Sequence, residues 1–309
     1  MLYLTLLAGF AALIIGAEVF VRACVYIAAL MRVPPLIIGL TIVAVGTSMP
    51  ETVININAAT RGVTDIAVGN ILGSNMVNLM LIVGICALVK PMIIKFSEIR
   101  RDYLTGLGFT VILLILMLAF PVAIPRWGAG VLFFSYLIYA TFIIRAAANS
   151  PKSESKEKED SKMSLPKAAL FFVAGLAAII IGGDITVDSA VRIAAGLGIS
   201  DRIIGLTVIA IGTSLPEFVI CLIACFRGGN DIAMGNIIGS SAVNIAFILG
   251  LTGLISPLAV NSGLVLDNII LLAFTLFAII FFYRGKIGRP AGALMAALYL
   301  GYMGYAIFN

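Results

Sequence analysis

The sequence of 309 residues is 61% hydrophobic and 11% charged, with a net charge of +5 and a mean hydropathy of +1.15. A soluble domain is nearer half apolar and a quarter charged, so this composition excludes an ordinary soluble enzyme and a disordered chain. The absence of histidine excludes Ser-His-Asp catalysis and most zinc sites, and the absence of a basic patch with interleaved aromatic residues excludes a nucleic-acid partner. We expect an integral membrane protein that is not an enzyme and has no cofactor.

Ten apolar segments along the chain are each long enough to cross a bilayer as a helix. Their expected ranges are 2–21, 35–60, 66–89, 103–121, 127–147, 167–187, 203–226, 231–256, 263–283 and 290–308. The first has no basic segment before it and contains Glu18, so we interpret it as a span rather than a cleaved signal. Residues 148–166 form a polar linker, expected to be mobile, between two halves, 1–147 and 167–309.

The two halves repeat each other at an offset of 166 residues. Residues 37–51 read IIGLTIVAVGTSMPE and residues 203–217 read IIGLTVIAIGTSLPE, with 11 of 15 positions identical. A second block, residues 62–78 against 228–244, is identical at 11 of 17 positions. Because each half has an odd number of spans, the second half enters the membrane from the opposite side. The predicted fold is therefore an all-α membrane protein with ten transmembrane helices in two inverted five-helix repeats, an architecture common in transporters.

The basic residues indicate the orientation. Lys and Arg concentrate in the loops after the third, fifth and ninth spans, whereas the opposite loops hold only a few, such as Arg61, Arg126 and Arg202. The positive-inside rule then predicts a multi-pass cell-membrane protein with linker 148–166 in the cytoplasm and both termini outside.

Glu51 and Glu217 lie mid-way through a span in each half. A carboxylate there costs several kcal/mol unless something neutralises it. Neither its own span nor the next one supplies a Lys or Arg, so protons and bound cations remain as the neutralisers. A protonated glutamic acid that only bonds a neighbouring helix is the structural alternative, and the duplication within one motif argues against it.

Oxygen donors surround each glutamate in the motif GTS-x-PE. One helical turn earlier lie hydroxyl residues, which a helix places on the glutamate's face: Thr47 and Ser48, and Thr213 and Ser214. Pro50 and Pro216 lack an N–H, and each lies four residues after a glycine. This pattern predicts a broken helix that lines a cavity. Carboxylate, hydroxyl and carbonyl oxygens suit hard cations such as Ca²⁺ and Na⁺.

The motif GN-x-x-GS-x-x-x-N predicts a second wall of this site. In each half, polar residues recur every four positions and form one stripe on a helix: Asn70, Ser74 and Asn78, and Asn236, Ser240 and Asn244. The glycines permit close helix approach. A packing interface cross-linked by Asn and Ser is the alternative, but the duplicated GTS-x-PE motif beside the stripe favours a shared site at the membrane midplane.

Several polar residues fit this site less well. Asn55 lies one turn past Glu51, but its repeat partner is Cys221. Glu18 and Asp184 are repeat partners that fit either a water-filled path or helix ends. Cys221 and Cys225 lie one turn apart, and we interpret them as buried apolar residues rather than a metal or redox pair.

GTSMPE with GNILGSNMVN, and GTSLPE with GNIIGSSAVN, resemble the two α-repeats of the sodium/calcium exchanger family, within the cation/Ca²⁺ exchanger superfamily. The resemblance covers nearly the whole chain and locates the α-repeats at 37–78 and 203–244. It implies exchange of Ca²⁺ for Na⁺ by alternating access, in which the first and sixth spans slide past the core. It also implies cation sites lined by Glu51, Glu217, Thr47, Ser48, Thr213, Ser214, Ser74 and Ser240, with backbone ligands at Ala44 and Ala210 and polar contacts from Asn78 and Asn244.

The sequence departs from the family at one position that matters. Some members have an aspartate where this chain has Asn244, and Ser241 stands where the first half has Asn75. The site then has two obvious carboxylates, whose charge of −2 matches one Ca²⁺ or two Na⁺. The number of Na⁺ sites and the coupling ion therefore stay open.

Three other functions remain to be weighed against Na⁺-coupled exchange. A proton-coupled Ca²⁺ exchanger is the nearest, because buried glutamates also bind protons. A passive cation channel is disfavoured by two broken helices in inverted repeats. An intramembrane carboxylate protease is disfavoured by the lack of histidine and of an aspartate dyad. The expected partners are the lipid bilayer and the transported Ca²⁺ and Na⁺, and we expect a monomer.

Overall fold

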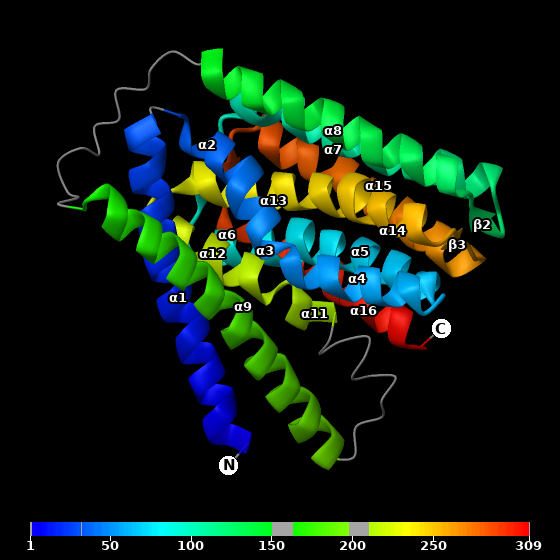
Figure 1. Ribbon diagram of the computed structural model, residues 1–309, viewed down its shortest axis with the longest axis horizontal. Coiled ribbons are helices and arrows are strands. Elements are labelled where there is room, and N and C mark those ends of the chain that lie inside the picture. The colour runs from blue at the N-terminus through cyan, green and yellow to red at the C-terminus, as the bar shows by residue number, and fades with distance from the viewer. Residues whose placement is uncertain (1, 32, 150–162, 198–209, 309) are drawn as a thin grey trace.

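The computed structural model describes residues 2–31, 33–149, 163–197 and 210–308 (Figure 1). The predictions for linker residues 150–162 and for the start of the seventh span, 203–209, lie outside this part of the chain. In the first half the helices are α1 (Leu2–Met31), α2 (Pro35–Ile38), the π-helical segment η1 (Gly39–Val43), α3 (Ala44–Thr47), α4 (Met49–Thr60), α5 (Thr64–Met76), the π-helical segment η2 (Val77–Ile82), α6 (Val83–Val89), α7 (Phe96–Ala119) and α8 (Arg126–Asn149).

The described helices of the second half follow the same order. They are α9 (Leu165–Gly196), α11 (Ala210–Thr213), α12 (Leu215–Phe226), α13 (Asn230–Ala242), the π-helical segment η5 (Val243–Ile248), α14 (Leu249–Ile255), α15 (Ser262–Tyr283) and α16 (Arg289–Phe308). Within the described ranges, seven helices are long and apolar enough to cross a membrane, and the bent pair Pro35–Thr47 and Met49–Thr60 makes an eighth span. The prediction of an all-helical membrane protein is confirmed.

The first and sixth helices are longer than predicted. α1 reaches Met31 and α9 reaches Gly196, well beyond the expected ends at residues 21 and 187. Hydropathy marks the apolar part of a helix, whereas the helix itself continues past Arg22 and Arg192, whose side chains are exposed. Long basic side chains reach the membrane surface while their stems stay against the helix, so they mark the end of the apolar run but not of the helix.

α1 and α9 pack along each other and cross the other helices obliquely (Figure 1). Glycines make this close approach possible: a Cβ on Gly175 would lie 2.8 Å from the Gly16 carbonyl oxygen, and one on Gly182 would lie 2.9 Å from the Gly9 carbonyl oxygen. Gly9 and Gly175 are 166 residues apart, as are Gly16 and Gly182. The repeat therefore maps each of the two contacts onto the other. The interface has the two-fold relation that inverted repeats require.

The broken second span packs tightly against α13. A Cβ on Gly239 would lie 2.6 Å from the Leu40 carbonyl oxygen, and one on Gly235 would lie 2.5 Å from that of Leu36. The predicted close approach of a glycine pair is therefore present in the second half. For the matching pair in the first half, Gly69 and Gly73, the equivalent partner segment falls in residues 202–206, outside the described part of the chain.

Two short antiparallel ribbons link the halves. β1 (Met92–Ile93) pairs with β4 (Lys286–Ile287), and β2 (Ala123–Ile124) pairs with β3 (Leu258–Ala259). Met92 and Leu258 are again 166 residues apart. Each ribbon joins a loop of one half to a loop of the other.

Candidate cation-binding site

Both predicted helix breaks are present. Ser48 separates α3 from α4 with φ −82° and ψ 14°, and the two parts of this span are bent by 47°. Ser214 separates α11 from α12 with φ −89° and ψ 6°. The proline that follows each serine lies in the first turn of the new helix, where its missing N–H costs nothing. Glu51 and Glu217 consequently lie in the first turns of α4 and α12, where the helix dipole favours a carboxylate.

The two glutamates are completely buried. The Glu217 Oε1 atom accepts hydrogen bonds from Ser48 Oγ at 3.1 Å and Ser240 Oγ at 3.4 Å. Glu217 Oε2 and both carboxylate oxygens of Glu51 have no hydrogen-bond donor among the described residues. In that same part of the chain neither glutamate forms an ion pair with Lys or Arg. These oxygens therefore point into the protein with free coordination capacity for a cation.

Hydroxyl groups from both halves enclose these carboxylates. Thr47 Oγ1 lies 3.5 Å from Ser240 Oγ, which joins the second span to the eighth. Ser74 Oγ lies 3.5 Å from Thr213 Oγ1, which joins the third span to the seventh, beside Glu51. These contacts join residues of both GTS-x-PE motifs to Ser74 and Ser240, one residue from each polar stripe.

The remaining predicted ligands lie in the broken second and seventh spans and in the π-helical segments of the third and eighth spans. Asn78 is fully buried in η2, and neither its amide nitrogen nor its amide oxygen has a partner among the described residues. Asn244 lies at the equivalent place in η5. The Ala44 carbonyl oxygen accepts from Ser48 N at 3.1 Å and Thr47 Oγ1 at 3.3 Å, so it already has two donors. Ala210 is the first residue of α11.

Three residues that fit the site less well in the sequence are Asn55, Cys221 and Cys225, and all three are buried. The Asn55 amide donates to the Glu51 carbonyl oxygen at 2.7 Å, within its own helix. Cys221 Sγ donates to the Ala233 carbonyl oxygen at 3.5 Å. Cys221 and Cys225 are both buried and free, as expected for apolar packing residues. The polar residue with a role that the sequence did not reveal is Asn75, which contacts Asn244.

A cavity of about 310 Å³ leads to this centre from one side. It lies between α9 and the broken second and seventh spans, and its lining includes Asp184, Asp188, Pro50, Gly212 and Thr213. These parts of α9 and α4 are the ends away from the linker, so the cavity opens on the side opposite to the linker. Asp184 therefore faces a path to the site, which is one of the two roles that its sequence position allowed.

Comparison with known proteins fits this geometry. A profile described as "Sodium/calcium exchanger protein" matches residues 1–145 and 167–308. The chain belongs to the sodium/calcium exchanger family. It is thus a membrane transporter rather than an enzyme, as the sequence predicts.

Relatives in this family match the chain over almost its full length. It is 34% identical to "Putative antiporter CaxA" of Alkalimonas amylolytica, covering 98% of this chain and 97% of the relative. It is 32% identical to "Sodium/calcium exchanger MaX1" of Methanosarcina acetivorans, covering 97% of each. A solved structure of the sodium-calcium exchanger NCX_Mj superimposes with a TM-score of 0.86 at 29% identity, covering 98% of this chain and 99% of the other. The predicted ten-helix fold of two inverted repeats is confirmed.

Proposed function

We propose that this exchanger-family protein moves Ca²⁺ across the cell membrane in exchange for Na⁺, by alternating access to the site that holds Glu51 and Glu217. The observation that carries the proposal is the pair of fully buried glutamates, three of whose four carboxylate oxygens lack a donor among the described residues. Buried charges are paired or coordinate metals, and no basic side chain of the described residues pairs with these two. The printed names of MaX1 and NCX_Mj, a sodium/calcium and a sodium-calcium exchanger, support the same choice of ions.

We infer the ligand set that the family resemblance implies. Glu51 and Glu217 would supply the charge, and further oxygens would complete the shell: Thr47, Ser48, Thr213, Ser214, Ser74, Ser240, Asn78 and Asn244, with the backbone at Ala44 and Ala210. Two carboxylates carry −2, which one Ca²⁺ or two Na⁺ neutralise. Because the same oxygens serve both, the ions compete, and competition at a site open to one side at a time gives antiport.

The halves and the orientation belong to the same proposal. Residues 1–147 and 167–309 form the two five-helix repeats, with α-repeats at 37–78 and 203–244, and the family profile leaves out residues 146–166 between them. We assign linker 148–166 to the cytoplasm and both termini to the outside, because Lys and Arg concentrate on the linker side. The cavity that leads to Thr213 then faces outward.

Flux measurements with imposed gradients test the coupling ion. Proteoliposomes that contain the purified protein are loaded with Na⁺, K⁺ or acid in turn, and uptake of Ca²⁺ is followed. A Na⁺ gradient is expected to drive uptake, and a K⁺ gradient is not. Uptake driven only by a pH gradient would show that protons, and not Na⁺, are the coupling ion at the two glutamates. Uptake without any ion on the other side would indicate a channel and overturn the proposal.

The charge of the site predicts the electrical behaviour of exchange. With only two carboxylates, exchange of one Ca²⁺ for two Na⁺ moves no net charge, whereas a third Na⁺ would make transport electrogenic. Current recorded during Na⁺-driven Ca²⁺ flux separates the two stoichiometries. Electrically silent exchange would reject the third ion, and a current would show that a further Na⁺ binds without a further carboxylate.

A further inference from the structure

Asn244 in η5 presents the two ends of its amide to different surroundings. Its Nδ2 atom donates to Asn75 Oδ1 at 3.0 Å, and its Oδ1 atom is buried without a donor among the described residues. Asn75 lies in α5, so this bond crosses between the two halves of the protein. The hydrogen bond to Asn75 therefore occupies the Asn244 amide nitrogen, and the Asn244 amide oxygen remains available to a cation.

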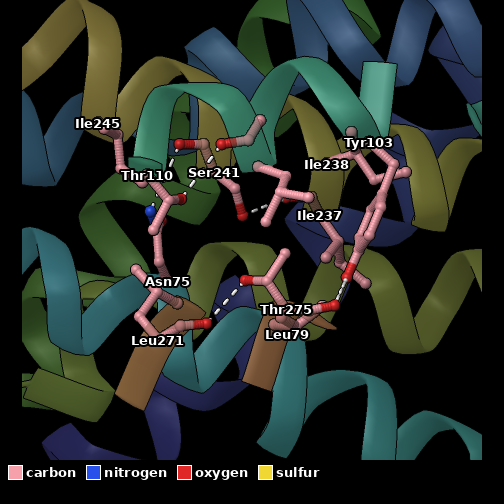
Figure 2. A pocket seen from close by; sticks show the side chains of 12 residues that line it. Asn75, Leu79, Tyr103, Thr110, Ile237, Ile238, Ser241, Ile245, Leu271 and Thr275 are labelled. Atoms are coloured by element: carbon pink, nitrogen blue, oxygen red, sulfur yellow. Dashed lines mark hydrogen bonds between the residues drawn. The ribbon is translucent and has the colours of Figure 1, made fainter. Parts of the chain in front are cut away.

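The Asn75 side chain has little freedom to form a different set of hydrogen bonds. Its own Nδ2 atom donates to the Ser241 carbonyl oxygen at 3.4 Å, which leaves Oδ1 as the acceptor for Asn244. Behind Asn75 lies a cavity of about 30 Å³, in which Figure 2 shows Asn75 beside Thr110 and Thr275. Both threonine hydroxyls donate to carbonyls of their own helices, at 3.1 Å and 2.8 Å. The rest of the cavity wall is largely apolar, so no competing donor turns the Asn75 amide round.

The first half lacks the equivalent contact. Ser241 is the repeat partner of Asn75, and its Oγ donates to the Ile237 carbonyl oxygen at 2.9 Å within its own helix. Asn78, the repeat partner of Asn244, has no partner on either end of its amide among the described residues. The two site asparagines therefore differ: Asn244 is held in one orientation, and Asn78 is not.

We propose that Asn75 is a positioning residue that fixes the Asn244 amide with its oxygen toward the transported cation. This inference rests on the proposed function. An amide can coordinate a cation only through its oxygen, because its nitrogen carries two donors and no acceptor. A fixed orientation removes the cost of turning the amide on binding, which is the general advantage of preorganisation. In a site with two carboxylates, an oriented neutral oxygen takes the place at which some relatives carry a third acid.

Substitution of Asn75 by leucine tests this, because leucine has a similar size and cannot accept a hydrogen bond. Asn75→Leu is expected to weaken Ca²⁺ binding about three- to tenfold, the size of one neutral hydrogen bond, and to raise the KM of Ca²⁺ uptake more than it lowers kcat. Binding is measured by calorimetry on the purified full chain, with Ca²⁺ as titrant. Asn75→Ser introduces the residue type that the second half has at the equivalent position, Ser241. It is expected to weaken binding similarly and serves as the second variant.

A double-mutant cycle separates positioning from a general structural effect. If Asn75 acts through Asn244, Asn75→Leu has no further effect on Ca²⁺ affinity in a protein that already carries Asn244→Ala. Ser241→Ala is the matched control and is expected to leave affinity unchanged. An equal loss in both backgrounds, or no loss in either Asn75 variant, would overturn the positioning role while leaving the exchanger function intact. A wild-type protein that neither binds nor transports Ca²⁺ would instead overturn the proposed function, and this inference with it.

Discussion

Glu51 and Glu217 occupy the same place in nearly identical motifs, yet their hydrogen bonds differ. Ser48 donates to Glu217, whereas the hydroxyl of its repeat partner Ser214 has no partner among the described residues. The cavity reaches Thr213, on the Glu51 side of the site. An inverted-repeat transporter is open to one side at a time, so its two halves must differ in any one state. At the level of single residues, the unequal hydrogen bonds agree with a state that is open on the cavity side only.

Removal of either carboxylate charge is expected to abolish transport. Glu51→Gln and Glu217→Gln should each reduce Ca²⁺ uptake by at least about 100-fold, because loss of one partner of a buried charge pair costs about 3–5 kcal/mol. Glu98→Gln is the control, since Glu98 is exposed and pairs with Lys95 at 3.1 Å. Uptake is measured in proteoliposomes at equal protein content. Wild-type uptake by either buried variant would contradict the site assignment.

At the scale of the elements, the helix breaks followed from the sequence and the long-range contacts did not. Pro50 and Pro216 each end a run of backbone hydrogen bonds locally, so the breaks at Ser48 and Ser214 are visible in the motif. The glycine contacts between α1 and α9 and the bond from Asn244 to Asn75 join residues far apart in the chain. Neither follows from local spacing, because each depends on how whole helices pack.

The glycines between α1 and α9 give a prediction for these two helices. A Cβ on Gly175 would lie 2.8 Å from the Gly16 carbonyl oxygen and 2.9 Å from Phe20 Cβ, so Gly175→Ala must push the helices apart. We expect a loss of stability of about 1–3 kcal/mol, seen as a lower midpoint of thermal unfolding in detergent. Gly108→Ala is the matched control in α7, where a Cβ meets nothing within 4 Å and helix propensity favours alanine. Equal midpoints for the two variants would show that the close contact does not limit packing.

On the scale of the whole molecule, an ion pair joins two elements on the linker side, and a cavity opens on the other. Arg227, at the end of α12, donates from Nε to Glu18 Oε2 of α1 at 2.9 Å. The repeat partners of these residues are Arg61, at the end of α4, and Asp184, which lines the cavity. In the described residues Asp184 forms no ion pair. Since inverted repeats exchange their conformations when access alternates, we expect Asp184 to approach Arg61 when the cavity closes.

This exchange of ion pairs predicts opposite effects of two similar substitutions. Glu18→Gln removes a contact of the state that is open on the cavity side. Asp184→Asn would remove the contact with Arg61 that we expect in the state open on the linker side. Partly exposed pairs contribute up to about 1 kcal/mol, so each substitution should shift the balance of states by up to about fivefold. In proteoliposomes with one orientation of the protein, Glu18→Gln should lower the apparent KM for Ca²⁺ on the linker side and raise it on the other. Asp184→Asn should do the reverse, because apparent affinity scales with the population of the state open to that side.

The control for this pair of variants is again Glu98→Gln, since the ion pair of Glu98 with Lys95 involves neither α1 nor α9. Loss of ion attraction at an acidic entrance would instead raise the KM on the cavity side for Asp184→Asn, and it would leave the linker side unchanged. The reciprocal change on the linker side is therefore the measurement that decides. If the two substitutions change the apparent KM on a given side in the same direction as each other, the ion pairs do not determine which side is open. Closure must then depend on the packing of α1 and α9 alone.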